Sequence, residues 1–329
     1  MKFVRSAATG RQTSERGFAL ITVLLVVALV AILSSELLYR QYADLKRSAQ
    51  RLHQTQSLAV VWGLESWVRL GLKADLKDNQ VDHLEEVWAT PMPPVPFEGG
   101  TLAGRLIDLQ GRLNLNNLME NEDEKRKLWA DIINRYAQQM GLADGFSDRL
   151  RDWIDSDDDP MPYGAESDRY LLKEPAYQPA NRPMVFLKEV RNLEEWKRLK
   201  TEHWALFEQT ACVLPAVTAI NVNTAEPQVL LALTEWMNTS MVQNWVTKRR
   251  TDPADDRAEF RSFLQQETGF GEEEILQALP DWMIDVQSGF FLLDAQVDYG
   301  ESSQGVKEIF YRRDRNTVGL LQRWLSVTD

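Results

Sequence analysis

The sequence predicts an α+β fold in which one long amino-terminal helix packs on a small antiparallel sheet, with a large all-α domain inserted in that sheet. Apolar residues recur every three or four positions in residues 39–72, and no proline interrupts this helical pattern. Alternating apolar and polar residues predict strands at 99–116 and again from residue 290 onward. Residues 122–285 lie between these two regions and are chiefly helical in pattern, and this order indicates an insertion into one sheet.

Each element is predicted from its local pattern. The long helix begins at Phe18 and runs for about 50 residues, until Gly71 and a polar run end it. The prolines at residues 91–96 predict a non-helical connector, and a turn at Gln110-Gly111 lies within the first strand region. Helices follow at residues 128–140, 150–154, 186–209, 225–237, 240–250, 257–268 and 272–279, and strands at 290–298, 306–313 and 318–325.

The composition is that of a folded protein, and it excludes several classes of function. Of 329 residues, 44% are hydrophobic and 26% are charged, which excludes wholesale disorder. The formal net charge of -12 makes a phosphate backbone a poor partner without a local basic patch. Cys212 is the single cysteine, so one chain builds neither an intrachain disulfide nor a cysteine-based zinc or iron–sulfur site. We find no catalytic motif, the three histidines stand alone, and no enzyme is predicted.

A basic leader precedes a long apolar segment. Residues 1–17 carry four basic groups against one acid, whereas the rest of the chain has a net charge of -15. Residues 18–33 hold no charge, and the segment 18–38 spans about 30 Å as a helix, the hydrocarbon thickness of a bilayer. The positive-inside rule places the leader in the cytoplasm and most of the chain outside it. A cleavable secretory signal and a simple signal anchor are the alternative interpretations.

The junction Arg16-Gly17-Phe18 resembles the prepilin peptidase site of type IV pilins and type II secretion pseudopilins, since a short basic leader ends in Gly just before Phe and an apolar run. The resemblance implies that prepilin peptidase cuts between Gly17 and Phe18 on the cytoplasmic face of the inner membrane. It also implies that Phe18 becomes an N-methylated amino terminus, and that the apolar stretch is kept as half of a pilin-like long helix.

Thr22 is an informative departure from the pilin pattern. Most pilin-like subunits have Glu as the fifth residue after the cut, where a carboxylate in lipid needs a cationic partner, and this chain has Thr22 there. The resemblance implies that this substitution marks the K-type minor pseudopilins of type II secretion, which sit at the fibre tip. Alternatively, Thr22 is simply tolerated in a single-pass anchor, where its hydroxyl bonds back to its own helix.

A segment rich in acids follows the predicted helix at 150–154. Six acids lie within residues 152–166, and those at the first, third, fifth and twelfth positions from Asp155 have the spacing of a calcium loop. Pro160 stands where an EF-hand requires Gly, so a calcium loop here has a different geometry. An acidic, solvated loop without a metal is the alternative. The candidate calcium ligands are Asp155, Asp157, Asp159, Glu166 and Asp168.

Residues 220–225, Ile-Asn-Val-Asn-Thr-Ala, look like the start of a helix-hairpin-helix or SAM-like unit, with Asn223 or Thr224 as the expected helix cap. In nucleic-acid binders, such a unit carries a glycine hairpin whose amides meet phosphate, and no such glycines follow here. The basic run 248–250 is followed at once by acids. We therefore interpret the unit as structural and predict no nucleic-acid partner.

The ordered set of motifs runs from the Gly17-Phe18 junction through residues 111–116 and the acidic segment to residues 221–225, and it is similar to the K-type minor pseudopilins of bacterial type II secretion. The resemblance implies structural calcium and a tip complex with the I- and J-type minor pseudopilins. It also implies a role in starting and capping the fibre that exports folded proteins from the periplasm. It divides the chain into a cleaved leader (1–17), a transmembrane helix (18–38), an α+β domain (39–116 and 286–329) and an inserted helical domain (117–285).

Two other classes of function are kept as alternatives. One is a membrane-anchored helix-hairpin-helix protein that binds DNA in a competence-like system, which a salt-dependent gel shift would distinguish. The other is an anchored periplasmic hydrolase, for which the acidic loop is the only support.

Overall fold

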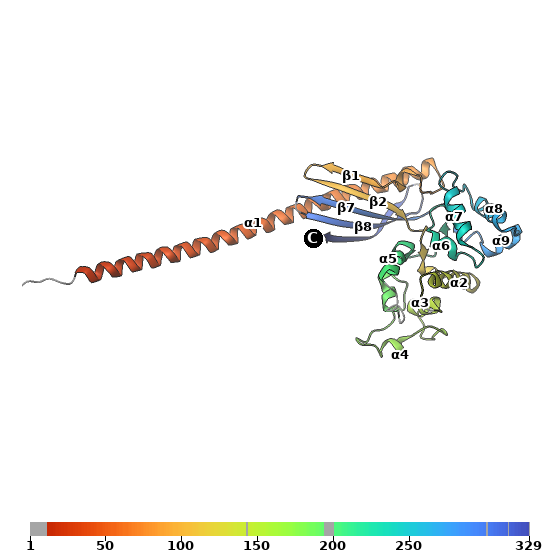
Figure 1. The fold of residues 1–329 in the computed structure, drawn as a ribbon, viewed down its shortest axis with the longest axis horizontal. Helices are drawn as coiled ribbons and strands as arrows, with labels where there is room; N and C mark the ends of the chain where they lie inside the picture. Colours follow the sequence, from red (N-terminus) through yellow and green to blue (C-terminus); the bar gives the residue numbers. More distant parts are fainter. Residues whose placement is uncertain (1–11, 143, 194–200, 301, 315, 329) are drawn as a thin grey trace, which may run out of the picture.

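The computed structural model describes residues 12–142, 144–193, 201–300, 302–314 and 316–328. It confirms the α+β fold: a single helix, α1 (Gln12–Asp78), leads into a head that holds an antiparallel sheet and many helices (Figure 1). The first half of α1 projects away from the head, with no other described element beside it. Residues 1–11 of the predicted leader lie outside the described residues.

Helix α1 is uninterrupted over 67 residues because its sequence contains no proline. It continues past Gly71, because Leu72 and Leu76 are buried against the head, and ends at Asp78, within the polar run expected to end it. Among the described residues, it is the one helix that is long and apolar enough to cross a membrane, and its apolar window is not buried within the chain.

Five strands form the sheet, in the order β1-β2-β7-β8-β9, and every neighbouring pair is antiparallel. The proline segment expected to be a connector forms the edge strand β1, because proline is tolerated where one side of a strand has no backbone partner. After a short helical turn, η1 (Val87–Ala89), the strands are β1 (Met92–Phe97), β2 (Gly100–Asp108), β7 (Phe290–Tyr299), β8 (Ser302–Arg312) and β9 (Val318–Thr328).

The second half of α1 packs on one face of this sheet. Val61, Leu64, Val68 and Leu72 recur at helical spacing and are buried. They meet alternate residues of β7 and β8, since side chains of a strand point to opposite faces in turn. The strand residues of this core include Phe291, Leu293, Val297, Val306 and Phe310.

Between β2 and β7 the chain forms a helical part with its own core, built around Trp129, Ile133, Tyr136 and Trp245. Its elements are β3 (Leu113–Asn114), η2 (Leu115–Met119), α2 (Asp123–Gln139), α3 (Phe146–Ile154), α4 (Ser167–Tyr170), η3 (Leu187–Asn192), α5 (Thr201–Thr210), β4 (Ala211–Cys212), β5 (Ile220–Asn221), α6 (Pro227–Ala232), α7 (Thr239–Lys248), α8 (Arg257–Thr268), α9 (Glu272–Ala278) and β6 (Ile284–Asp285).

Two local expectations are wrong. The turn at Gln110-Gly111 does not join two strands of the sheet, because β3 pairs in parallel with β4 of the helical part. The single helix expected at 186–209 is two elements, η3 and α5, and residues 194–200 between them lie outside the described residues. The helical part begins and ends at one place, since the Leu109 backbone N–H donates to the Phe290 carbonyl oxygen at 2.9 Å.

Candidate calcium site, domain joint and membrane anchor

The acidic segment forms a loop that buried aromatic side chains hold at both ends. Helix α3 ends with Asp155 as its C-cap, and α4 begins directly after Glu166. The rings of Trp153 and Tyr170 pack edge to face, with centroids 5.4 Å apart, so the two ends of the loop are held together. Acids from both ends of the loop are thereby brought to one place.

Three of the five predicted calcium ligands come together. Carboxylate oxygens of Asp155, Asp157 and Glu166 lie within 4.8 Å of one another. Glu166 is 2% exposed, and neither of its carboxylate oxygens has a hydrogen-bond partner among the described residues. Asp155 Oδ1 is also buried and without such a partner. Because a hard divalent cation satisfies buried carboxylate oxygens of this kind, the residues present fit calcium.

The charges of this cluster repel one another. Burial raises the pKa of Glu166 to about 7, and the neighbouring carboxylates of Asp152 and Asp155 add to the shift. Burial and Asp157 likewise raise the pKa of Asp155. Arg151 Nε lies 3.6 Å from Asp155 Oδ2 and offsets part of this charge. A raised pKa marks a carboxylate whose negative charge is poorly compensated, and a bound cation would compensate it.

The other two predicted ligands, Asp159 and Asp168, are exposed and lie outside the cluster. Asp159 donates its backbone N–H to Asp157 Oδ1 at 3.0 Å, and so shapes the loop through its main chain. Asp168 lies in the first turn of α4. The calcium-loop spacing counts positions in a template, whereas this loop contains Pro160 and follows another path, so the structure brings together Asp155, Asp157 and Glu166 alone of the five acids.

Sequence reasoning missed Asp152, which supports the loop from inside. Its side chain is buried and accepts the backbone N–H of Met161 at 3.1 Å. Burial raises the pKa of Asp152 to about 6. Gly164 lies against this carboxylate, and a Cβ atom at Gly164 would stand 1.8 Å from Asp152 Oδ2. The signal in the sequence was an acid just before the template, followed by the only glycine within the loop.

Replacing Gly164 with alanine is expected to destabilise the protein by about 1–3 kcal/mol, because an added methyl group forces the buried Asp152 carboxylate or the loop to move. The gain in melting temperature on adding calcium should also shrink. Thermal unfolding with calcium and with a chelator measures both effects. Gly271→Ala is the matched control, because a Cβ atom there meets nothing within 4 Å. Identical melting curves for the two variants would contradict this description of the loop.

A buried polar cluster, here called the joint, connects the sheet to the helical part. Arg312, at the end of β8, lies 2.5 Å from the Asp82 carboxylate and donates to the Ser288 carbonyl oxygen at 2.8 Å. Asp108, at the end of β2, accepts from Thr224 Oγ1 at 2.5 Å and from Asn221 Nδ2 at 3.2 Å. The joint comprises Asp82, Asp108, Asn221, Thr224, Ser288 and Arg312, all buried.

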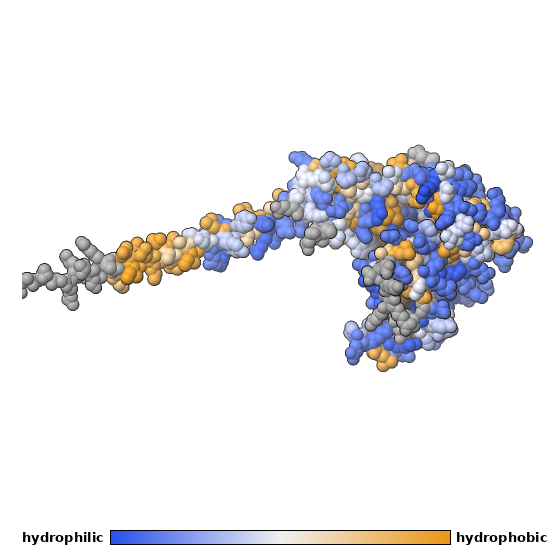
Figure 2. All heavy atoms as spheres, in the orientation of Figure 1, coloured by the Kyte–Doolittle hydropathy of each residue, from blue (hydrophilic) through white to orange (hydrophobic). Residues whose placement is uncertain are grey.

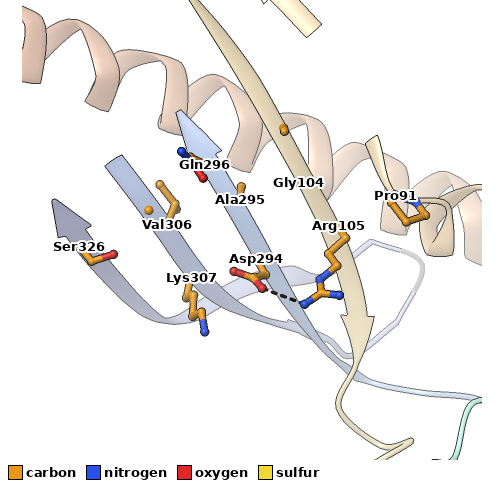
Figure 3. Close-up of a pocket in the computed structure, with 11 residues that line it drawn as sticks. Pro91, Gly104, Arg105, Asp294, Ala295, Gln296, Val306, Lys307 and Ser326 are labelled. Carbon is orange, nitrogen blue, oxygen red and sulfur yellow. Dashed lines mark hydrogen bonds and ion pairs between the residues drawn. The ribbon is translucent and has the colours of Figure 1, made fainter. Parts of the chain in front are cut away.

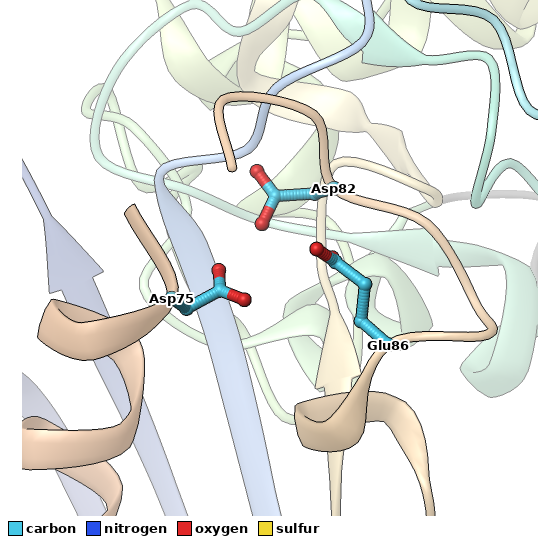
Figure 4. Close-up of side chains that lie close together, drawn as sticks. All are labelled: Asp75, Asp82 and Glu86. Atoms are coloured by element: carbon cyan, nitrogen blue, oxygen red, sulfur yellow. The ribbon is translucent and has the colours of Figure 1, made fainter. Parts of the chain in front are cut away.

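Carboxylates of Asp75, Asp82 and Glu86 also lie close together (Figure 4), but each has donors within the protein. Arg312 pairs with both aspartates, at 2.7 Å from Asp75 and 2.5 Å from Asp82. Glu86 accepts a hydrogen bond from the indole N–H of Trp88 at 2.6 Å. Oxygens that are already paired with an arginine and an indole form an ion-pair network rather than a metal site.

Residues 220–225 contribute Asn221 and Thr224 to the joint. Thr224, one of the two expected helix caps, donates its hydroxyl to Asp108 instead. Arg249 is buried and donates to two backbone carbonyl oxygens of this unit, at 2.9 and 2.8 Å. Lys248 pairs with Asp252 at 2.5 Å. Arg249 is therefore bonded inside the protein, whereas Lys248 is partly exposed in its ion pair with Asp252.

The membrane anchor is the amino-terminal part of α1, whose apolar side chains appear orange toward the left of Figure 2 and are exposed. Thr22 lies within it. The Thr22 hydroxyl donates to the Phe18 carbonyl oxygen at 2.7 Å, and the Ala19 carbonyl oxygen lies 3.1 Å from the same hydroxyl. This local bonding satisfies a hydroxyl in lipid without a neighbouring chain. Gly17 and Phe18 lie in one continuous helix.

Comparisons with known proteins identify the family. Two sequence models described as "Type II secretion system (T2SS), protein K" match residues 111–216 and 220–277. The type II secretion system protein K of Pseudomonas aeruginosa is 35% identical over 267 residues, which cover 77% of this chain and 78% of that protein. This chain belongs to the type II secretion system protein K family. The protein K of Aeromonas hydrophila is 26% identical over 327 residues, 94% of this chain and 96% of that protein.

A solved structure has the same fold. The chain is similar to one in the crystal structure of the GspK-GspI-GspJ complex from the enterotoxigenic Escherichia coli type 2 secretion system, with a TM-score of 0.73 and 21% identity. The match covers 86% of this chain and 99% of the other. As a protein K, the chain is a minor pseudopilin, a structural component of the secretion machine. The one apolar helix long enough to span a membrane in the described part of the chain makes it a single-pass, membrane-anchored protein. These matches do not favour the DNA-binding alternative.

A hollow lies on the sheet face of this protein K (Figure 3). The hollow has a volume of about 380 Å³ because small residues such as Gly104, Ala295 and Gly305 line it. Its charged side chains are Lys307 and the pair Arg105 and Asp294, which lie 3.3 Å apart. Among the residues that line it there is no pair of acids and no histidine for acid–base chemistry.

Proposed function

We propose that this minor pseudopilin is the tip subunit of the type II secretion pseudopilus, where it starts and caps the fibre that exports folded proteins from the periplasm. The size and place of the helical part support the proposal. It has a core of its own and lies at the end of the molecule away from the anchor (Figure 1). A head of this bulk covers the surface on which the next subunit would stack.

The leader fixes the orientation and is then removed. Four basic groups before an uncharged apolar run keep the leader in the cytoplasm, so the head lies in the periplasm. Prepilin peptidase cuts between Gly17 and Phe18 at the inner membrane, and Phe18 becomes the N-methylated amino terminus. The remaining helix stays in the inner membrane until the subunit is assembled. With Thr22 in place of the usual acid, the new tip needs no cationic partner at that depth.

The capping step is tested by removing the helical part. Because Leu109 and Phe290 are hydrogen-bonded neighbours, a short linker can replace residues 111–288. Asp108→Asn is added because the deletion removes the side chains that donate to the Asp108 carboxylate. This variant is expected to enter the shaft, and immunogold labelling of sheared fibres should then show it along their length. The full chain should label fibre ends only, and end-only labelling of the variant would refute capping by the helical part.

Calcium is proposed as a structural ion of the loop between α3 and α4. Asp155, Asp157 and Glu166 would hold it, with further oxygens from the loop backbone or water. The support is the set of three buried carboxylate oxygens without hydrogen-bond partners. The ion would tie the two ends of the loop together, and no chemistry beyond this is assigned to it. We propose accordingly that the protein is not an enzyme.

The proposed partners are the I- and J-type minor pseudopilins, together in one tip complex. The support is that the solved structure with this fold is a complex of GspK with GspI and GspJ. Prepilin peptidase is a transient partner that acts on the leader. No nucleic acid is among the proposed partners, since the basic run 248–250 is largely engaged within the protein.

A further inference from the structure

A groove of about 820 Å³ lies between the helical part and the face of the sheet opposite α1. The strand residues that line it include Leu292, Ile309 and Trp324, one each from β7, β8 and β9. Their neighbours Leu293 and Phe310 belong to the core with α1, since side chains of a strand point to opposite faces in turn. Residues 185–189 of the helical part form another side of the groove. The sheet therefore separates this groove from α1.

Arg112 supplies the groove with a cation that the protein only partly satisfies. Its Nη1 donates to the Glu208 carbonyl oxygen at 3.0 Å, whereas its Nε is buried and has no hydrogen-bond partner among the described residues. Arg112 forms no ion pair within the described part of the chain. Burial accordingly lowers the pKa of Arg112. A carboxylate from outside would satisfy this guanidinium through charge-assisted hydrogen bonds.

The other charged side chains of the groove also favour an anion. Lys188 and Lys307 line it, both are exposed, and neither forms an ion pair with a described residue. Of the two acids in the lining, Glu189 is engaged, because it lies 3.6 Å from Arg182 and accepts two backbone N–H groups. The three cations of the groove thus face one acid, Glu208, that is not engaged in this way.

The rest of the lining is largely apolar and is partly exposed. Val185 is 39% exposed and Phe186 is 48% exposed, and the Phe186 ring packs edge to face on Trp324 with centroids 6.3 Å apart. Exposed aromatic side chains beside a cation are typical of protein interfaces.

The groove continues into the hollow of Figure 3, because Lys307 and Ser326 line both. Together they form an open trough across neighbouring strands. A pocket for a small molecule usually encloses its ligand, whereas an open trough with exposed apolar walls fits an extended chain.

We propose that the groove binds an extended peptide segment of another protein, in which apolar side chains flank a carboxylate. The carboxylate would pair with Arg112, and the apolar side chains would pack on Phe186 and Trp324. This inference does not rest on the position of the chain in the fibre. It adds an interaction surface on the side of the sheet that α1 does not cover.

Selection from a displayed library of random octapeptides tests the proposal. The target is the full chain in lipid nanodiscs, and empty nanodiscs remove peptides that bind lipid. Enriched peptides are expected to carry an aspartate or a glutamate beside aromatic or aliphatic residues. The most enriched peptide is labelled, and fluorescence anisotropy measures its dissociation constant. Changing its acid to the amide should weaken binding to the wild-type chain about tenfold or more.

Substitutions in the chain locate the contact. Arg112→Gln should weaken binding of the acidic peptide about as much, and the acid-to-amide change should then have no further effect, because both changes remove one interaction. Trp324→Ala should weaken binding of both peptides. Arg313→Gln is the control and should change neither, since Arg313 is exposed and does not line the groove.

Several results would overturn the proposal: no enrichment, enriched peptides without an acid, or an acid-to-amide effect that persists in Arg112→Gln. If Arg112→Gln does not fold, the acid-to-amide change and Trp324→Ala still decide the matter, since a loss of affinity from neither would overturn it as well. Binding that appears only in a Trp196→Ala chain would assign the groove to residues 194–200 of the chain itself, against the proposal.

Discussion

Replacing Arg312 with leucine is expected to lower the free energy of unfolding by about 3–5 kcal/mol, because it leaves buried acids of the joint without a cation. Asp82 is 1% exposed and lies 2.5 Å from the Arg312 guanidinium. Burial raises the pKa of Asp82 to about 7 even beside this arginine. Without Arg312, the acids must bind protons to stay inside. The loss in free energy of unfolding should therefore be larger at pH 8, which favours the ionised form of the buried acids, than at pH 5.

Urea unfolding of the detergent-solubilised chain, followed by tryptophan fluorescence, measures the effect. Arg313→Leu is the matched control, because Arg313 is the next residue and is exposed, and it should change stability by less than about 0.5 kcal/mol. A loss below about 1 kcal/mol for Arg312→Leu, the range of a surface ion pair, would show that the joint does not hold the head together.

When the calcium concentration is a hundred times the dissociation constant of the site, calcium is expected to raise the free energy of unfolding of the wild-type chain by about 2.7 kcal/mol. The Glu166→Gln variant should lose most of this gain. The order of stability should reverse in a chelator at pH 8. There the wild type carries a buried, ionised Glu166 without a partner, since its pKa is about 7. The glutamine variant removes that charge and should melt at the higher temperature.

Thermal unfolding at fixed protein concentration, with calcium or with chelator, measures both results. Asp159→Asn and Asp168→Asn are the controls, because both side chains are exposed and outside the cluster of Asp155, Asp157 and Glu166. They should keep the calcium response of the wild type. A full response in Glu166→Gln, or its loss in Asp159→Asn, would contradict the ligand set proposed here.

The parts of the fold that depend on local periodicity could be predicted from the sequence. The long helix and the strands β7 to β9 follow from apolar residues at spacings of three to four and of two. Strand β1 could not, because prolines argue against a strand unless its position at the edge of the sheet is known. The break between η3 and α5 leaves the apolar pattern of 186–209 intact and so gives no signal.

The candidate sites show the same limit. Acids that share one loop could be proposed together from spacing, and three of them do meet. The joint could not be proposed, because Asp82 and Arg312 are separated by 230 positions and Asn221 and Asp108 by 113. The local pattern predicts that Asn221 and Thr224 start a helical unit, whereas their side chains bond to the distant Asp108. Such roles follow from tertiary contacts, which no local pattern records.

The most direct test of the account is mass spectrometry of the amino terminus of the chain recovered from secreting cells. The account predicts that the mature protein begins at Phe18, with a methyl group on its amine, and retains the whole apolar segment of α1. A protein that still carries Met1, or one cut beyond the apolar segment, would contradict the central claim that α1 is kept as the assembly helix of a pseudopilin.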